Sequence, residues 1–219
     1  MITAELDASR LDLTETGGRM RGRIELSSAA VSAAGKVTRG ETTTSALSLR
    51  PESYAQAVKT GLRMQSTMTL VPGRYQLRIA AGNTQTDTIG SVMYDLDVPD
   101  FDKGRLTMSA VALSTAGTGP AASTVRREFA AGTPLSLYVE VYDNAAGRDS
   151  RTIELTVGLR SVDGRTMRSA RDRRTRTAKG TETFLMAVPL DVDAGSYVLH
   201  VEATSGDANV SRDIPIRVR

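Results

Sequence analysis

The chain has 219 residues, a formal net charge of +3 and 40% hydrophobic residues, and it contains neither cysteine nor tryptophan. The lack of cysteine excludes disulfide bridges, cysteine-ligated zinc and thiol catalysis. The length fits one large domain or two of ordinary size. No apolar run is long enough to cross a membrane and no signal peptide follows Met1, so we expect a mature or excised part of a longer protein.

Residues 1–99 predict a β-sandwich domain. Thr, Ser, Val and Gly are abundant, and apolar residues alternate over short runs, as is typical of strands. About seven strands in roughly 100 residues fit a sandwich. The expected strands lie at residues 2–7, 11–14, 20–33, 42–49 and 91–98, with two more between residues 63 and 81.

A short helix interrupts these strands at residues 51–60. Pro51 suits the first helical position, and Glu52 suits the positive end of the helix dipole. Lys59 suits the opposite end, and Gly61 suits the position after the last turn. We therefore expect one helix within an all-β chain.

Residues 100–105 predict a linker, after which the strand pattern restarts. Alternation is clearest at residues 135–141, where four apolar positions share one face. We expect a second β-sandwich domain over residues 106–219, joined in tandem to the first. Its further strands are expected at residues 106–114, 151–159, 183–190, 197–203 and 214–218.

One motif occurs in both halves and indicates a tandem repeat. Gly73-x-Tyr75 and Gly195-x-Tyr197 each begin an alternating strand of the form G-x-Y-x-L-x-[IV]-x-A. The second copy has the D-x-G-x-Y form of the tyrosine corner of immunoglobulin-like sandwiches. We assign these four residues a structural role and predict two immunoglobulin-like or fibronectin-like sandwiches. Chance similarity among Thr- and Val-rich strands is the alternative.

His200 is the only histidine, so a Ser-His-Asp site would have to use it. Its place in the repeat corresponds to Arg78 in the first copy, which indicates an ordinary outward-facing strand position. The sequence has neither a G-x-S-x-G motif nor a serine followed three residues later by lysine. We therefore assign no catalytic residue.

Four aspartates surround the linker and form a candidate calcium site. Calcium takes six to eight oxygen ligands, and carboxylates at a domain junction can rigidify it. The clustered D-x-D-x-D-G loop is missing, so solvated acids are the alternative. The candidate ligands are Asp95, Asp97, Asp100 and Asp102.

A basic run between residues 165 and 179 is the most prominent charge feature. It has seven basic residues and one acid, Asp172, for a local charge of +6. Such a run is a candidate site for polyanions, although it contains no aromatic residue for base stacking. A solvated hairpin loop between strands is the alternative. The candidate anion-binding residues are Arg165, Arg168, Arg171, Arg173, Arg174, Arg176 and Lys179.

Several segments resemble the carboxy-terminal tail of bacterial von Willebrand factor A-related proteins. In that family an amino-terminal A domain with a metal-ion-dependent adhesion site precedes the tail, and export is usual. Here the A domain is missing. Residues 7–11 (DASRL) match its D-x-S-x-S metal loop only in part, because Leu11 stands where the last serine should be. The resemblance therefore implies a secreted, periplasmic or cell-envelope location but no adhesive metal site. The similar segments are LRPESY (49–54), PGRYQLR (72–78), GSVMYDLDVPDF (90–101), REF (127–129) and YVEVYDN (138–144).

Taken together, the sequence predicts a non-catalytic interaction or structural module of an exported bacterial protein. The expected partner is a protein, and no cofactor is expected apart from the candidate calcium. One alternative is a hydrolase without a recognisable motif. Another is polyanion binding through the basic hairpin at residues 165–179.

Overall fold

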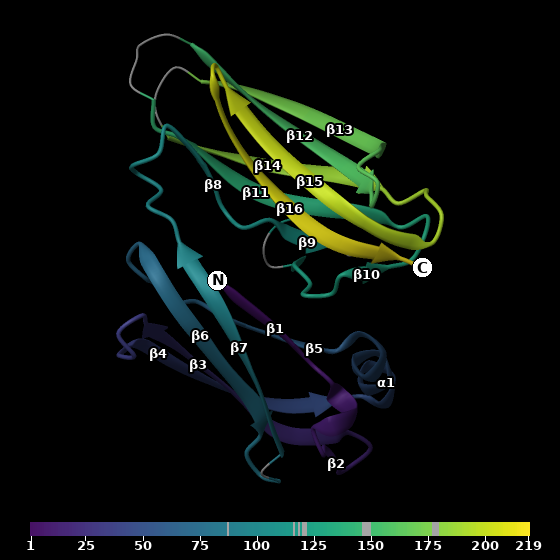
Figure 1. Cartoon of the computed structure of the whole chain (residues 1–219). Helices are drawn as coiled ribbons and strands as arrows, with labels where there is room; N and C mark the ends of the chain where they lie inside the picture. The colour runs from purple at the N-terminus through teal and green to yellow at the C-terminus, as the bar shows by residue number, and fades with distance from the viewer. Residues whose placement is uncertain (87, 116, 118, 120–121, 146–149, 177–179) are drawn as a thin grey trace. The chain divides into compact units, whose positions relative to one another are not determined.

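A computed structural model describes residues 1–219 except 87, 116, 118, 120–121, 146–149 and 177–179 (Figure 1). The chain divides into two compact units, Met1–Asp100 and Phe101–Arg219. The division falls within the segment for which the sequence predicted a linker. The fold is all-β with one short α-helix, as predicted.

Unit 1 (Met1–Asp100) contains two antiparallel sheets. The smaller sheet pairs β1 (Ile2–Leu6) with β5 (Leu62–Ser66). The larger sheet has the order β4-β3-β6-β7, and a short strand, β2, also pairs with β3. The strands of the larger sheet are β2 (Thr14–Glu15), β3 (Met20–Ser32), β4 (Val37–Leu49), β6 (Gly73–Asn83) and β7 (Thr88–Val98).

The predicted helix is present as α1 (Pro51–Thr60), with Pro51 in its first turn. Gly61 ends it with a φ of 81°, a left-handed conformation that favours glycine, and its N–H donates to Ala57 O at 2.8 Å. The sequence predicted a strand at residues 11–14, but of these only Thr14 is in a strand, β2, and a 3-10 turn, η1 (Ala8–Arg10), precedes the segment. The Asp7 side chain accepts the Ser9 N–H at the start of η1, an Asx-type cap that competes with extended backbone.

Unit 2 (Phe101–Arg219) is a sandwich of two larger sheets. One sheet has the order β10-β16-β15-β12-β13, and the other has the order β14-β11-β8, with β9 also pairing with β11. These connections make the Greek-key pattern of an immunoglobulin-like sandwich. The strands are β8 (Leu106–Met108), β9 (Ala112–Ser114), β10 (Glu128–Phe129), β11 (Pro134–Asp143), β12 (Arg151–Ser161), β13 (Thr166–Arg176), β14 (Gly180–Pro189), β15 (Gly195–Ser205) and β16 (Ala208–Val218).

The two units share an equivalent set of six strands. β1 pairs with β5 as β11 pairs with β14, and β4-β3-β6-β7 follows the same order as β13-β12-β15-β16. The sequence repeat sets β6 against β15. Tyr75 and Tyr197 are both buried, and their hydroxyls donate to the carbonyls of Val71 at 3.0 Å and Asp193 at 2.8 Å, four residues upstream in each case.

The cores of the two units differ in continuity. Unit 2 has one cluster of buried side chains drawn from both of its sheets, whereas the buried side chains of unit 1 fall into two smaller clusters. On the inward face of β3, Ser28 and Ala30 occupy the positions that Val157 and Leu159 hold in β12. Less apolar area is therefore removed from water in unit 1, which makes it the less stabilised of the two.

Candidate functional site

The basic run does not form the expected loop. Most of it is strand β13, which pairs with β12 and lies at the end of its sheet. The loop prediction was wrong because charged side chains on both faces hide the alternation of an edge strand. Arg165 lies in the turn before β13, while Lys179 lies outside the described residues.

Two outward-facing arginines of β13 share one carboxylate, and Arg168 on the opposite face pairs with a different one. Arg171 and Arg173 both make ion pairs with Glu154 on the neighbouring strand, the first at an Nε–Oε1 distance of 3.1 Å. Arg168 donates from Nε to Asp191 Oδ1 at 2.6 Å, and this bond holds the pKa of the Asp191 carboxyl below its ordinary value. These cations are already paired with acids, which weakens the case for polyanion binding.

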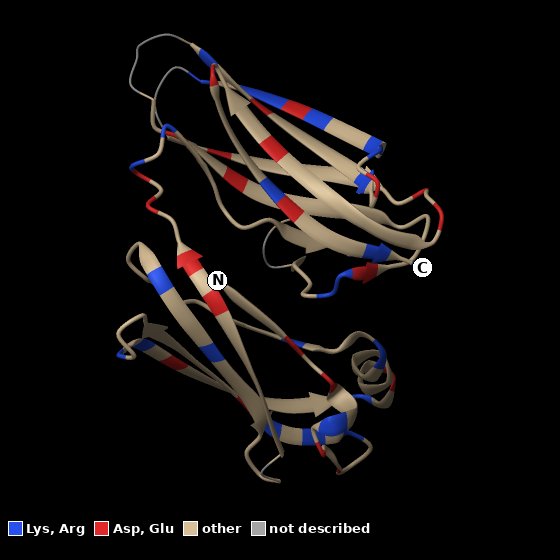
Figure 2. Cartoon of the chain, viewed as in Figure 1, with Lys and Arg blue, Asp and Glu red and all other residues tan. Residues whose placement is uncertain are grey.

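Arg174 and Arg176, on the same face as Arg168, point toward the sheet that contains β14. Arg174 lies 5.8 Å from the ring centre of Phe184 on β14 and pairs with Asp172 at 2.9 Å. Arg176 pairs with Glu182 on β14 at 3.4 Å. Inward-pointing charges of this kind close the open side of a sandwich and discourage edge-to-edge association. In Figure 2 the ribbon of this strand has blue segments with a red one among them.

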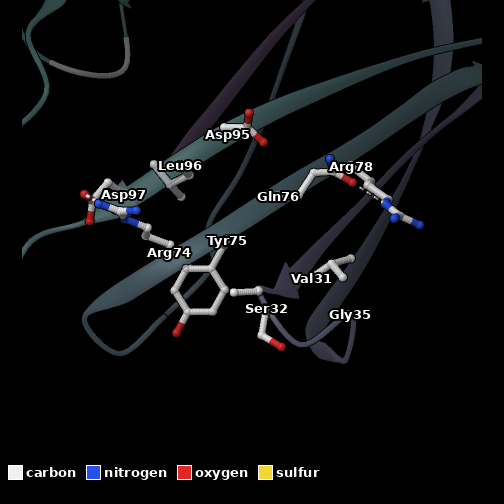
Figure 3. A pocket seen from close by; sticks show the side chains of 11 residues that line it. Val31, Ser32, Gly35, Arg74, Tyr75, Gln76, Arg78, Asp95, Leu96 and Asp97 are labelled. Atoms are coloured by element: carbon white, nitrogen blue, oxygen red, sulfur yellow. Dashed lines mark hydrogen bonds and ion pairs between the residues drawn. The ribbon is translucent and has the colours of Figure 1, made fainter.

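The four candidate calcium ligands do not come together. Asp95 and Asp97 lie on the outer face of β7 beside a shallow depression of about 580 Å³ that Arg74 also lines (Figure 3). Arg74 Nε lies 3.9 Å from Asp97 Oδ2, so a cation already faces this carboxylate. Asp100 ends unit 1, and Asp102 belongs to unit 2. In the part of the chain that the structure describes, no group of three or more His, Asp or Glu side chains could hold a metal ion.

His200 lies on the outward face of β15 beside Asp213 of β16, with Nδ1 2.6 Å from Oδ1. The pair forms two members of a Ser-His-Asp arrangement. It stands on a sheet face among cross-strand neighbours, where such pairs stabilise sheet pairing. The residue opposite His200 on β12 is Gly158, which carries no side chain. No catalytic role for His200 is indicated by this geometry.

A polar cluster on the outward face of β11 was not predicted from the sequence. Tyr142 donates to Glu140 Oε2 at 2.7 Å, and Tyr138 donates to the other carboxylate oxygen. Burial, helped by the bond to Glu140, raises the pKa of Tyr142 to about 12. Phe101 packs against Tyr142 with ring centres 4.5 Å apart. The spacing of Tyr138, Glu140 and Tyr142 could have predicted this cluster, because residues i and i+2 of a strand share a face.

The edge strand β7 exposes apolar side chains on both faces. Ile89 is 69% exposed, Val92 61%, Met93 68% and Tyr94 63%. Among the described residues, β7 pairs with β6 on one side and with no strand on the other. A long apolar edge with free backbone groups is a template for pairing with another strand. Three consecutive apolar residues, Val92, Met93 and Tyr94, were the sequence signal, because alternation then puts an apolar side chain on each face.

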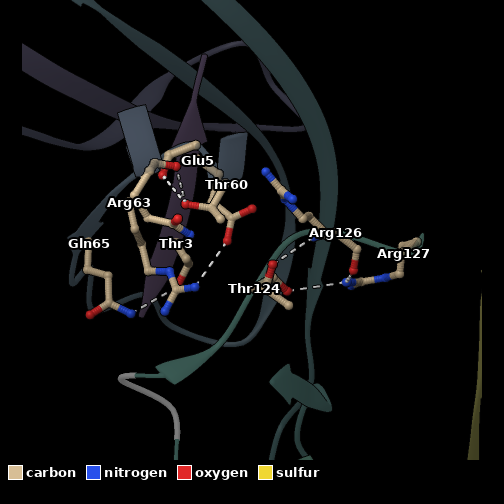
Figure 4. A network of polar contacts seen from close by, with 10 residues as sticks. Thr3, Glu5, Thr60, Arg63, Gln65, Thr124, Arg126 and Arg127 are labelled. Atoms are coloured by element: carbon tan, nitrogen blue, oxygen red, sulfur yellow. Dashed lines mark hydrogen bonds and ion pairs between the residues drawn. The ribbon is translucent and has the colours of Figure 1, made fainter. Parts of the chain in front are cut away.

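An apolar slot lies beside this edge, between β7 and β1. Its volume is about 420 Å³, and its lining comes mainly from β1, β6 and β7. Ile79 and Ala81 line it from β6, Leu6 lines it from β1 and Val92 lines it from β7. The β1 side is held to β5 by Arg63, which donates to Glu5 at 3.3 Å, and by the Gln65–Thr3 hydrogen bond at 3.2 Å (Figure 4).

No family model and no curated protein matches this sequence. Among solved structures, the chain is similar to the C-terminal domain of Wzt, with 11% identity and a TM-score of 0.41 over 54% of this chain and 75% of that chain. A likeness this distant does not indicate a ligand or a partner. No helix in the described part of the chain is long and apolar enough to span a membrane.

Proposed function

We propose that this chain is a non-catalytic interaction module of an exported bacterial protein, related to the carboxy-terminal tails of von Willebrand factor A-related proteins. The protein-binding part is unit 1, and its contact surface is β7 with the adjoining slot. The observation that carries the proposal is the long edge strand with four large apolar side chains more than half exposed.

The chemistry of this surface suits a polypeptide. Exposed apolar side chains gain free energy when another surface covers them. The unpaired backbone N–H and C=O groups of an edge strand can bond to an extended partner, as in β-augmentation. A surface that combines both features therefore favours a protein partner over a small polar ligand.

The other candidate functions have weaker support. Polyanion binding through β13 would have to break the ion pairs that Arg168, Arg171 and Arg173 make with carboxylates. A hydrolase based on His200 would need a serine and a substrate pocket beside the His200–Asp213 pair. Neither alternative accounts for the exposed edge of unit 1.

We also propose that Tyr75 and Tyr197 act as tyrosine corners. The support is the hydrogen bond of each hydroxyl to a carbonyl four residues upstream. Each ring lies over a glycine, with the nearest ring carbon 3.7 Å from a Cβ built at Gly73 and 3.5 Å from one built at Gly195. These are ordinary contact distances, so space alone does not require glycine at either position, whereas the φ of 151° at Gly73 is one that favours glycine.

Site-specific photo-crosslinking tests the interaction surface. A photoreactive phenylalanine analogue at Met93 in the bacterial cell envelope should give one discrete adduct, whose partner is identified, purified and tested for direct binding. The control places the same analogue at Val37, which is 59% exposed on β4, the opposite edge strand of the same sheet. An adduct that forms equally at both positions, or no adduct at Met93, would overturn the proposal.

A further inference from the structure

Unit 2 contains strands that have no counterpart in unit 1. The six strands shared by the two units account for every strand of unit 1 except β2. Unit 2 adds β8 and β9 beside β11, and β10 beside β16. The equivalents of β11 and β16 are β1 and β7. The strands missing from unit 1 therefore belong at the two borders of its slot.

The additional strands of unit 2 fill the space between its two sheets. Leu106 and Met108 of β8 are 9% and 0% exposed and belong to the core. Arg212 of β16 donates to the Met108 carbonyl at 3.0 Å, which ties β8 to the neighbouring sheet. Two apolar side chains at alternate positions thus close this side of the sandwich.

Strand β10 covers the edge of β16, with which it pairs in a parallel direction. The Arg217 N–H donates to the Arg127 carbonyl at 2.7 Å, and the Arg219 N–H donates to the Phe129 carbonyl at 2.9 Å. The segment that leads into β10 is also held in place, because Arg127 Nη1 donates to the Thr124 carbonyl at 3.3 Å (Figure 4). The edge of β16 is therefore covered from within the same unit.

The corresponding positions of unit 1 are open. Ala81 pairs with Gly90 in unit 1, and the equivalent pair in unit 2 is Ala203 with Val210. Val210 packs against the core of unit 2, whereas a Cβ built at Gly90 would meet no atom within 4 Å. The slot therefore has room for side chains where unit 2 is filled.

Backbone groups of β7 also point into the open space. The Thr84 N–H donates to the Arg23 carbonyl at 3.1 Å. Asn83 and Ile24, which lie opposite each other, are therefore a non-hydrogen-bonded pair of the β3–β6 ladder. By alternation, Asn83 and every second residue of β6 before it, such as Ala81 and Ile79, bond to β7. Odd-numbered residues of β7, such as Ser91 and Met93, then direct their N–H and C=O groups to the free side.

We infer that unit 1 is an incomplete sandwich that is completed by an extended strand of a partner protein seated in the slot between β1 and β7. This inference rests on the proposed function and specifies its partner. The strand runs parallel to β7 and antiparallel to β1, as the added strands of unit 2 do. It carries apolar side chains at alternate positions, in the manner of Leu106 and Met108.

The charges around the slot favour an uncharged segment over a basic one. Two carboxylates border the slot, those of Glu5 and Asp7. Glu5 is paired with Arg63 at 3.3 Å, and Asp7 is paired with Arg10 at 3.5 Å. Since both acids already have cationic partners, neither requires a lysine or an arginine from the incoming strand.

Peptide binding to the full chain tests the inference. The probe is a fluorescein-labelled peptide with the sequence of residues 106–114, which has no charged side chain and fills the equivalent space in unit 2. We expect saturable binding by fluorescence anisotropy. A peptide with Asp in place of the residues equivalent to Leu106 and Met108 should bind at least about tenfold more weakly.

Two chain variants locate the binding. Val92→Lys puts an ammonium group at the slot and should weaken binding at least about tenfold. Val37→Lys makes the same change on the opposite edge strand at nearly equal exposure, 59% against 61%, and should leave binding unchanged. Both positions are exposed, so both variants should fold.

The outcomes separate this inference from the proposed function. No saturable binding up to about 1 mM peptide, or equal weakening by both variants, overturns the inference. A dimer of the chain alone that Val92→Lys dissociates would also overturn it, because the occupant would be a second copy. If peptide binding fails while the Met93 adduct forms, the proposed function stands without strand insertion. If both fail, both proposals are wrong.

Discussion

Units 1 and 2 share a pattern of six strands, but only unit 2 has the further strands β8, β9 and β10. In unit 2, additional strands close the sandwich, and one continuous core lies between the sheets. In unit 1, two smaller cores lie beside an open slot and an exposed edge strand. One topology can therefore form either a closed sandwich or one with an open edge, according to what covers its last strand.

The largest expected effect is at the repeated tyrosine. Tyr197→Ala removes a buried ring and a hydroxyl bond, so it should lower the free energy of unfolding of unit 2 by about 3 kcal/mol. Tyr197→Phe keeps the ring and should cost only about 1 kcal/mol. Urea denaturation measures both values. An unchanged transition in the alanine variant would contradict the packing of β15.

A smaller effect is expected at Ser28, where the two cores differ. Its hydroxyl is buried and has no hydrogen-bond partner among the described residues, at the position that Val157 holds in unit 2. Ser28→Val should therefore stabilise unit 1 by about 1 kcal/mol. Amide hydrogen exchange, resolved by unit, measures the gain.

The reciprocal change, Val157→Ser, sharpens the same comparison. It buries a hydroxyl in a continuous apolar core, so it should destabilise unit 2 by roughly 2 kcal/mol. Loss of stability in both variants would show that the two cores are not interchangeable at this position.

Gly90→Val tests the open slot with a still smaller stability effect. Replacing an interior strand glycine by a β-branched residue should stabilise unit 1 by roughly 0.5–1 kcal/mol. Valine should also occupy space that the probe peptide needs, so peptide affinity should fall. Thermal denaturation and anisotropy measure the two effects. Unchanged affinity would place the peptide away from Gly90.

The smallest expected effect concerns the carboxylate of Asp191. Its pKa is lowered because Arg168 donates to it, so the pair contributes stability above the unfolded pKa, which is near 3.8. That contribution is lost as the pH falls through the folded pKa. Arg168→Leu should return the pKa of Asp191 toward 3.8 in a carbon-13 NMR titration. Arg165→Leu is the control and should leave it unchanged.

Much of the fold could be predicted from local patterns, while the binding surface could not. Alternation at residues 135–141 and the Pro51 to Gly61 signals identified strands and the helix because period and capping are local properties. The arginines of β13 misled the prediction, since their acidic partners come from other parts of the chain: Glu154 from β12, Glu182 from β14 and Asp191 from the segment after β14. Asp95 and Asp97 share a face as expected, yet the cation opposite them, Arg74, comes from β6.

The sequence by itself determined the all-β class, the helix and the Gly-x-Tyr repeat, because hydrophobic period and turn chemistry act over a few residues. Only the tertiary structure decided which strand is left at an edge, because pairing depends on segments far apart in the chain. The exposure of Val92 and Met93 follows from the absence, among the described residues, of any strand on the side of β7 opposite β6. In unit 2 the equivalent edge is covered by β10, and the same repeat there makes a closed sandwich.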